Sequence, residues 1–253
     1  MHQGIRGGLP LTGERTVPGV PSENYWFRRH EAAYEFALPL VTGATVLEVG
    51  CGEGYGTARL ARAAGRVVGV DYDAGTVTHA AASYLSARFV RGNLAALPVR
   101  SESVDVVASL QVVEHVWDHG EFVRECLRVL RPGGALFLTT PNRLTFSPGR
   151  DVPVNPFHSK EFAADELVDL LGRHGCAIET VFGVHASRRL VELDRAYGGS
   201  FVDAQLAAPP DQWTSRLRRD VASVGVADFT VLAADLHQVD EALDLAVVAR
   251  RPG

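Results

Sequence analysis

The sequence predicts an α/β protein in which a mostly parallel sheet carries helices on both of its faces. Short apolar, β-branched segments alternate with helical segments between residues 45 and 140, as in a series of βαβ units. The first strand runs directly into a cluster of glycines, which is typical of a ligand-binding turn at the edge of such a sheet. The 253 residues provide room for one domain of this kind with insertions.

The expected elements follow one another in regular order up to residue 140. Residues 22–40 predict a helix, with Ser22 as a candidate N-cap because its hydroxyl can accept a backbone N–H. Apolar and β-branched residues predict strands at 45–49, 66–70, 88–91, 104–110 and 135–140. The helical segments that separate them are 57–64, 74–85 and 120–130.

The alternation breaks after Thr140. Residues 141–156 form a polar loop rich in Pro, Asn and Arg, and a helix at 160–173 and a strand at 177–182 follow it. Residues 183–228 are expected to be helical and irregular, and 243–249 to be the last strand of a seven-stranded sheet. Since insertions on a rigid scaffold usually carry binding residues, we expect substrate-binding insertions at about 141–160 and 183–228.

The N-terminal residues differ in composition from the rest of the chain. Gly and Pro occur throughout residues 1–21, which predicts a flexible N-terminal arm before a single domain at 22–253. The arm lacks the apolar core of a signal peptide, and no apolar run reaches the ~18 residues that span a bilayer. No membrane partner is therefore expected.

Charge and cysteine content narrow the function classes further. A formal net charge of −5 argues against a large nucleic-acid footprint, which needs a basic face. Cys51, Cys126 and Cys176 are too few and too far apart for a disulfide framework or a zinc site, so we expect a cytoplasmic protein. A monomer and a homodimer are equally compatible with the sequence.

The glycine-rich turn TVLEVGCGEGYG at 45–56 is the strongest functional signal. The next strand ends at Asp71, whose carboxylate could accept hydrogen bonds from both hydroxyls of a ribose. A dinucleotide site would need G-x-G-x-x-G. Counting from Gly50 puts Tyr55 at the third glycine position, and counting from Gly52 puts Thr57 there, so neither register fits.

The E-x-G-x-G-x-G pattern instead resembles motif I of the class I S-adenosylmethionine-dependent methyltransferases. RGNLAALPV at 91–99 is similar to the segment that holds adenine in this family, with Asn93 in place of the usual Asp; the Asn carbonyl can still accept from the adenine amino group. LRVLRPGGALFLTTPN at 127–142 resembles the helix, turn and strand before the substrate loop.

This resemblance implies a Rossmann-like class I methyltransferase fold with S-adenosyl-L-methionine as cofactor. The residues it places against the cofactor are Gly50, Cys51, Gly52, Tyr55, Asp71, Tyr72, Asn93, Leu94 and Gln111.

The helix at 22–40 also carries candidates for the cofactor site. We expect Tyr25 and Trp26 to cover the methionine end of the cofactor and Arg29 to face its carboxylate. The alternative is that Trp26 and Phe27 simply pack on the core.

Acid and histidine side chains follow the strand at 104–110. Glu114 and His115 come directly after it, and His158 lies in NPFHSKEF at 155–162. Either histidine could act as general base toward a hydroxyl. The alternatives are that Glu114 and His115 only shape the cofactor pocket and that His158 caps a helix or packs in a loop.

The same segments resemble terminal-ribose 2′-O-methyltransferases of small RNAs, in which E-x-x-E-H and a later histidine bind a divalent metal. The first position here is Gln111, whose carbonyl is still a ligand but carries no charge. This resemblance implies a Mg²⁺ or Mn²⁺ site of Glu114, His115, His158 and Gln111 that would lower the pKa of a substrate hydroxyl.

A finer resemblance runs nearly end to end. LTGERTVPG, SENYWFRRH, QVVEHVWD, TTPNRLTFSPGRDVPVNPFH and GGSFVDAQ are similar to the sugar 1-O-methyltransferases of methylmannose polysaccharide biosynthesis. This implies methylation of the reducing-end 1-hydroxyl of a short, partly methylated mannooligosaccharide. The alternatives are a metal-dependent 2′-O-methyltransferase of RNA ends, a quinone-type small-molecule O-methyltransferase, and a non-catalytic nucleotide-binding module.

Overall fold

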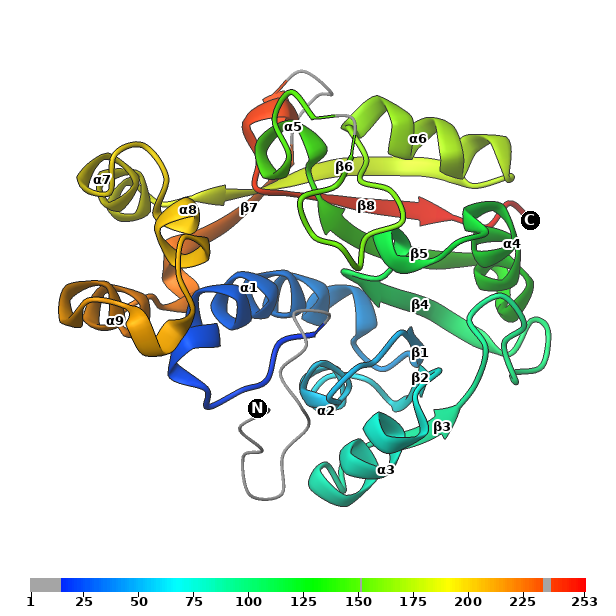
Figure 1. Ribbon diagram of the computed structural model, residues 1–253. Coiled ribbons are helices and arrows are strands. Elements are labelled where there is room, and N and C mark those ends of the chain that lie inside the picture. The colour runs from blue at the N-terminus through cyan, green and yellow to red at the C-terminus, as the bar shows by residue number, and fades with distance from the viewer. Residues whose placement is uncertain (1–14, 151, 234–237) are drawn as a thin grey trace.

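The fold is built on one eight-stranded sheet with the strand order β3-β2-β1-β4-β5-β8-β6-β7 (Figure 1). The computed structural model describes residues 15–150, 152–233 and 238–253, so residues 1–14 of the expected arm lie outside it. The strands are β1 (Thr45–Val49), β2 (Arg66–Asp71), β3 (Arg88–Arg91), β4 (Val104–Leu110), β5 (Leu130–Pro141), β6 (Ala177–Ala186), β7 (Phe229–Ala233) and β8 (Asp244–Arg250).

The mostly parallel α/β sheet is confirmed. β1 to β5 pair in parallel, whereas β8 runs antiparallel to both of its neighbours, β5 and β6. The expected strand number was wrong, because β7 adds an eighth strand antiparallel to β6. Only Phe229 of β7 is fully buried, so this edge strand shows no regular alternation of apolar and polar residues.

Helices cover both faces of the sheet. They are α1 (Asn24–Val41), α2 (Tyr55–Leu60), α3 (Ala74–Ser83), α4 (His119–Val129), α5 (Arg143–Phe146), α6 (Ala164–Arg173), α7 (Arg188–Ala196), α8 (Phe201–Leu206) and α9 (Ser215–Ala222). Neighbouring strand residues point to opposite faces: Val46 packs with α1 and α2, and Leu47 belongs to the core under α4 and α6.

Several element boundaries differ from the expected ones. A 3₁₀ turn at Pro21–Glu23 precedes α1, and Ser22 makes no capping hydrogen bond there. The polar loop after β5 contains the short helix α5, and α6 begins at Ala164, four residues after Lys160. No helix among the described residues is long and apolar enough to span a membrane.

The second insertion packs on the beginning of α1. Figure 1 shows α7, α8 and α9 gathered at one end of the sheet, next to β7 and the first turns of α1. A third apolar cluster joins them, in which Tyr25 of α1 contacts Phe201 of α8 and Phe229 of β7, with ring centroids 5.8 and 5.5 Å apart. The insertion is therefore anchored to the domain by aromatic side chains.

A buried ion pair ties α1 to the sheet. Arg29 Nε donates to Asp244 Oδ2 at 2.6 Å, and Arg29 Nη2 donates to Asp244 Oδ1 at 2.5 Å, while both side chains are almost fully buried. Arg29 Nη2 also donates to the Leu243 carbonyl. Asp244 is the first residue of β8 and pairs with Pro141 of β5, so the ion pair lies where α1, β5 and β8 meet.

We expect Asp244→Ala to lower the free energy of unfolding by about 3–5 kcal/mol, because it leaves the Arg29 charge buried without its partner. Urea denaturation measures this loss. The control is Arg124→Ala, which removes the exposed pair with Glu121 and should cost less than about 1 kcal/mol. Equal losses in the two variants would contradict the structural role of the Arg29–Asp244 pair.

Candidate active site

The glycine turn after β1 fits tightly against the segment that follows β4. Gly50 has a φ of +80°, and a Cβ atom at this position would lie 2.4 Å from Val112 Cγ2. The Gly52 N–H donates to Asp71 Oδ2 at 2.9 Å, and the Asp73 N–H donates to Asp71 Oδ1 at 3.0 Å. The turn and the end of β2 are thus held together, with the Asp71 carboxylate fixed between them.

A cavity of about 650 Å³, called here the first cavity, lies at the carboxyl ends of β1, β2 and β4. Its lining includes every residue that the sequence places against the cofactor outside α1: Gly50, Cys51, Gly52, Tyr55, Asp71, Tyr72, Asn93, Leu94 and Gln111. A volume of this size lies within the range of ~300–1,000 Å³ that is usual for ligand and cofactor sites. These residues therefore fit a cofactor with an adenosine group.

The candidates on α1 lie elsewhere. Tyr25 is buried in the apolar cluster under α8, and Arg29 is bound to Asp244. Trp26 and Arg29 line a second cavity of about 380 Å³ and are absent from the lining of the first. Instead, α1 brings His30 to the first cavity, and the predicted cofactor contacts of Tyr25, Trp26 and Arg29 stay predictions.

The two cavities adjoin each other. Both are lined by Arg15, Thr16, His30, Gln111 and His115. Gln111, directly after β4, has a φ of +57°, which is uncommon for a residue other than glycine and is often found at functional sites. Its Nε2 donates to Thr139 Oγ1 at 3.2 Å. The end of β4 is therefore the wall between the first and second cavities.

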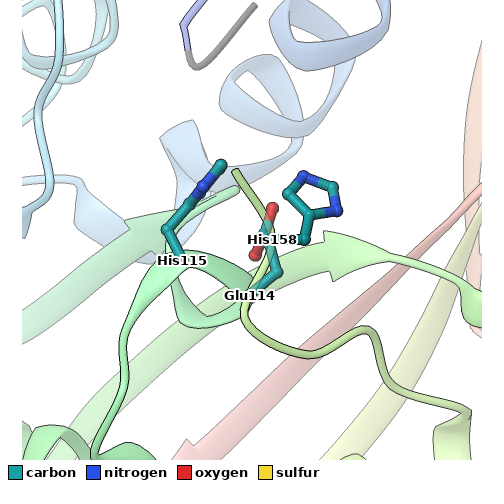
Figure 2. Close-up of side chains that lie close together, drawn as sticks. All are labelled: Glu114, His115 and His158. Atoms are coloured by element: carbon teal, nitrogen blue, oxygen red, sulfur yellow. The ribbon is translucent and has the colours of Figure 1, made fainter. Parts of the chain in front are cut away.

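Glu114, His115 and His158 lie close together, as Figure 2 shows, and all three line the second cavity. One ligand atom from each lies within 4.8 Å of the other two. Glu114 and His115 come from the 3₁₀ turn after β4, whereas His158 comes from the loop between α5 and α6. The structure thus brings together three of the four predicted metal ligands, and the fourth, Gln111, lines the adjoining wall.

Burial disfavours the charged forms of Glu114 and His115. It raises the pKa of Glu114 to about 8, although Thr140 Oγ1 donates to the carboxyl group at 2.9 Å. Burial first and the neighbouring His158 ring second lower the pKa of His115 to about 4. At neutral pH His115 is therefore an uncharged imidazole, which is the form that can accept a proton or bind a metal, while the raised pKa of Glu114 favours its protonated form as long as no cation lies beside it.

Hydrogen bonds define which ring nitrogens are available. His115 Nδ1 lies 3.0 Å from the Phe157 carbonyl oxygen, to which it donates, so its Nε2 carries the lone pair. His158 Nδ1 likewise donates to Glu161 Oε1 at 2.8 Å, and its Nε2 lies 3.2 Å from Asn155 Nδ2. Both histidines therefore present an acceptor nitrogen.

Sequence reasoning missed Glu161. Its side chain is nearly fully buried, and its Oε2 has no hydrogen-bond partner among the described residues. The carboxylate supports His158 in the way that outer-shell carboxylates orient metal-binding and catalytic histidines. The three-residue spacing from His158 in HSKE was the available signal, and it was taken only as the start of a helix.

The chain is similar to several known proteins. A methyltransferase domain model matches residues 47–138. A Mycolicibacterium smegmatis protein named "Probable S-adenosylmethionine-dependent methyltransferase" is 50% identical over 250 residues, which cover 98% of this chain and 97% of that protein. A ubiquinone biosynthesis O-methyltransferase of Rhizobium johnstonii is 38% identical over 42% of this chain and 44% of its own length. The fold is shared by a SAM-dependent methyltransferase from Thermotoga maritima, with a TM-score of 0.62, 17% identity, and coverage of 89% of this chain and 92% of that one.

We expect Asp71→Ala to weaken binding of S-adenosylhomocysteine by about 1.5–3 kcal/mol, because it removes charge-assisted hydrogen bonds to the ribose. Isothermal titration calorimetry measures the affinity. Asp71→Asn keeps one acceptor oxygen and should lose less. The control Asp169→Ala removes an exposed carboxylate of α6 and should bind normally. Wild-type affinity in Asp71→Ala would show that this carboxylate does not hold the ribose.

Proposed function

The chain belongs to the S-adenosylmethionine-dependent methyltransferases, and from this premise we propose that it methylates a sugar hydroxyl. The hydroxyl is the reducing-end 1-hydroxyl of a short, partly methylated mannooligosaccharide, as the finer sequence resemblance implies. One observation carries the proposal: the first and second cavities adjoin at Gln111 and His115, beside an acid and histidine cluster. A cofactor in one cavity and an acceptor in the other would meet at this wall.

The residues of the first cavity would hold the cofactor. Asp71 would bind the ribose, Asn93 the adenine amino group, and the backbone around Gly52 the amino-acid end. When bound, S-adenosyl-L-methionine supplies an electrophilic methyl group, so the protein needs no covalent intermediate of its own. The chain's task is to position the acceptor oxygen and to remove its proton.

The proton has two acceptors within the cluster. The hydroxyl must lose its proton as its oxygen forms the new bond to carbon, and Nε2 of His115 or His158 can take it. The Phe157 carbonyl and the Glu161 carboxylate accept from Nδ1 of the two rings, which makes both Nε2 atoms acceptors. Nε2 of His158 already lies 3.2 Å from Asn155 Nδ2, so Nε2 of His115 is the more available of the two. Without a metal ion, one imidazole would therefore act as the general base.

The donor set also fits a divalent cation. We propose that Glu114, His115 and His158 would hold it, with the Gln111 carbonyl as a further ligand. Two imidazoles beside one carboxylate suit Mn²⁺ better than Mg²⁺, which prefers oxygen ligands. Such an ion would acidify a hydroxyl of the acceptor.

The second cavity combines the features that a sugar ring requires. Trp26, Phe146 and Phe157 supply apolar faces, while Glu23 and Asn155 supply polar groups. A sugar presents both an apolar C–H face and hydroxyls, and a quinone ring with an apolar tail would not need so many polar neighbours. These features support a polar acceptor over a quinone.

The charge distribution of the second insertion argues against RNA as the acceptor. Three of its exposed arginines are paired with acidic residues, in Arg188–Glu192, Arg189–Asp228 and Arg216–Asp220. Paired guanidinium groups offer little net positive charge to a phosphate backbone. We therefore propose a small oligosaccharide as acceptor.

The test is transfer of radiolabelled methyl groups from the cofactor to mannosides, short RNAs and quinols, each with and without EDTA. We expect transfer to the mannosides, and we expect EDTA to abolish it and added Mn²⁺ to restore it. Full activity on mannosides in metal-free buffer would contradict the metal site and leave an imidazole as the base. Transfer to RNA or quinols alone would contradict the sugar acceptor.

Single variants distinguish a catalytic role of the two histidines from a general effect on folding. His115→Ala and His158→Ala should each lower the transfer rate by about 10²-fold or more, the usual contribution of acid–base groups. His174→Ala is the matched control because this histidine lines neither the first nor the second cavity. Loss of activity in the control would mean that the losses reflect folding.

A further inference from the structure

A third cavity of about 440 Å³ continues the second one on the side away from the cofactor. The second and third cavities share Arg29, Phe146, Val154 and Leu206 in their linings. Leu206 of α8 is 57% exposed, which leaves its apolar side chain available to a ligand that passes from one cavity to the other. The two cavities therefore form one path that leads away from the acid and histidine cluster.

Both insertions build this third cavity. The first contributes Thr145, Phe146 and Arg150, and the second contributes side chains of α7 and α8, including Asp194 and Asp203. None of the residues predicted from motif I or from the adenine segment lines it. The cavity is thus a feature of the parts that this chain adds to the common sheet.

A chain of aromatic rings follows the path, in which Trp26 and Phe146 are partly exposed whereas Tyr25 and Phe201 are buried. The ring centroids of Phe146 and Trp26 are 6.1 Å apart, those of Trp26 and Tyr25 are 5.2 Å apart, and those of Tyr25 and Phe201 are 5.8 Å apart. Trp26 lines the second cavity, and Tyr25 and Phe201 line the third. Trp26 and Phe146 therefore offer apolar surface to a ligand, and the buried rings of Tyr25 and Phe201 support them from the core.

Carboxylates also line the third cavity. Asp194 Oδ1 accepts from the Phe201 N–H at 2.8 Å and is thereby oriented at the cavity wall. The Asp203 N–H donates to Ser200 Oγ, while no described residue donates to the Asp203 carboxylate. A carboxylate pairs well with two neighbouring hydroxyls, whereas an apolar tail would desolvate it without compensation.

We propose that the third cavity binds the sugar units beyond the one that is methylated. The inference rests on the proposed function, and it makes the enzyme selective for acceptors of two or more units. Phe146 and Leu206 contact the sugar faces, and Asp194 and Asp203 accept hydrogen bonds from the sugar hydroxyls. The second insertion thus determines the preferred length of the acceptor, whereas His115 and His158 act at the hydroxyl that is methylated.

The test compares kcat/KM for mono-, di- and tetramannosides that have the same methylation at the reducing-end unit. We expect the wild type to prefer the tetramannoside over the monosaccharide by about tenfold or more, since one charge-assisted hydrogen bond has that value. Asp203→Ala should reduce this ratio about tenfold. Leu206→Trp, which narrows the passage between the second and third cavities, should abolish the preference.

Asp211→Ala is the matched control, because Asp211 is an exposed carboxylate of the same insertion that does not line the third cavity. Its ratio should equal that of the wild type, and thermal melting should show all variants folded. Transfer to the monosaccharide without any gain for longer acceptors would overturn the third cavity as a subsite while the proposed function stands. Transfer to no sugar would overturn both.

Discussion

The buried Arg29–Asp244 ion pair is the constraint on which the acceptor side of the molecule depends. It fixes α1 against the first residue of β8, at the point where β8 meets the end of β5. Arg29 also lines both the second and the third cavity, so the ion pair fixes a residue that the two cavities share. His30, the next residue on α1, is thereby held at the boundary of the first and second cavities. Each of these two charges would be costly to bury without the other. Together they set the position of α1 and, through it, of the second and third cavities.

The reactive cluster depends on the direction of the strands. β1, β2 and β4 run in parallel, so their carboxyl ends reach the same edge of the sheet. The turn after β1 forms one side of the first cavity, and the chain after β4 turns sharply at Gln111 before it presents Glu114 and His115. The loop after α5 then brings His158 to them from the opposite side (Figure 2). The core of the sheet thus provides the cofactor side, and the first insertion completes the acceptor side.

The sequence predicted local features well and long-range partners poorly. The first four strands could be located almost to the residue, because each is a short run with apolar or β-branched residues that ends at or next to a glycine or a polar residue. The glycine turn and Asp71 also follow from local spacing. Asp244 lies 215 residues from Arg29, and nothing near either residue indicates the pairing, so the sequence predicted only a cofactor contact for Arg29. Glu161 and β7 were missed for a related reason. The role of Glu161 depends on its contact with His158, and β7 is defined by its pairing with β6, and neither contact is visible in the local sequence.

The central claim is that an acceptor hydroxyl meets the transferred methyl group at the wall formed by Gln111 and His115. A crystal structure of the protein with S-adenosylhomocysteine and a partly methylated mannobiose tests it most directly. We predict the cofactor sulfur in the first cavity near Gln111. The 1-hydroxyl should lie in the second cavity, within hydrogen-bonding reach of His115 or His158 or of an ion that they hold. A mannobiose bound with every hydroxyl out of reach of both imidazoles would contradict the claim.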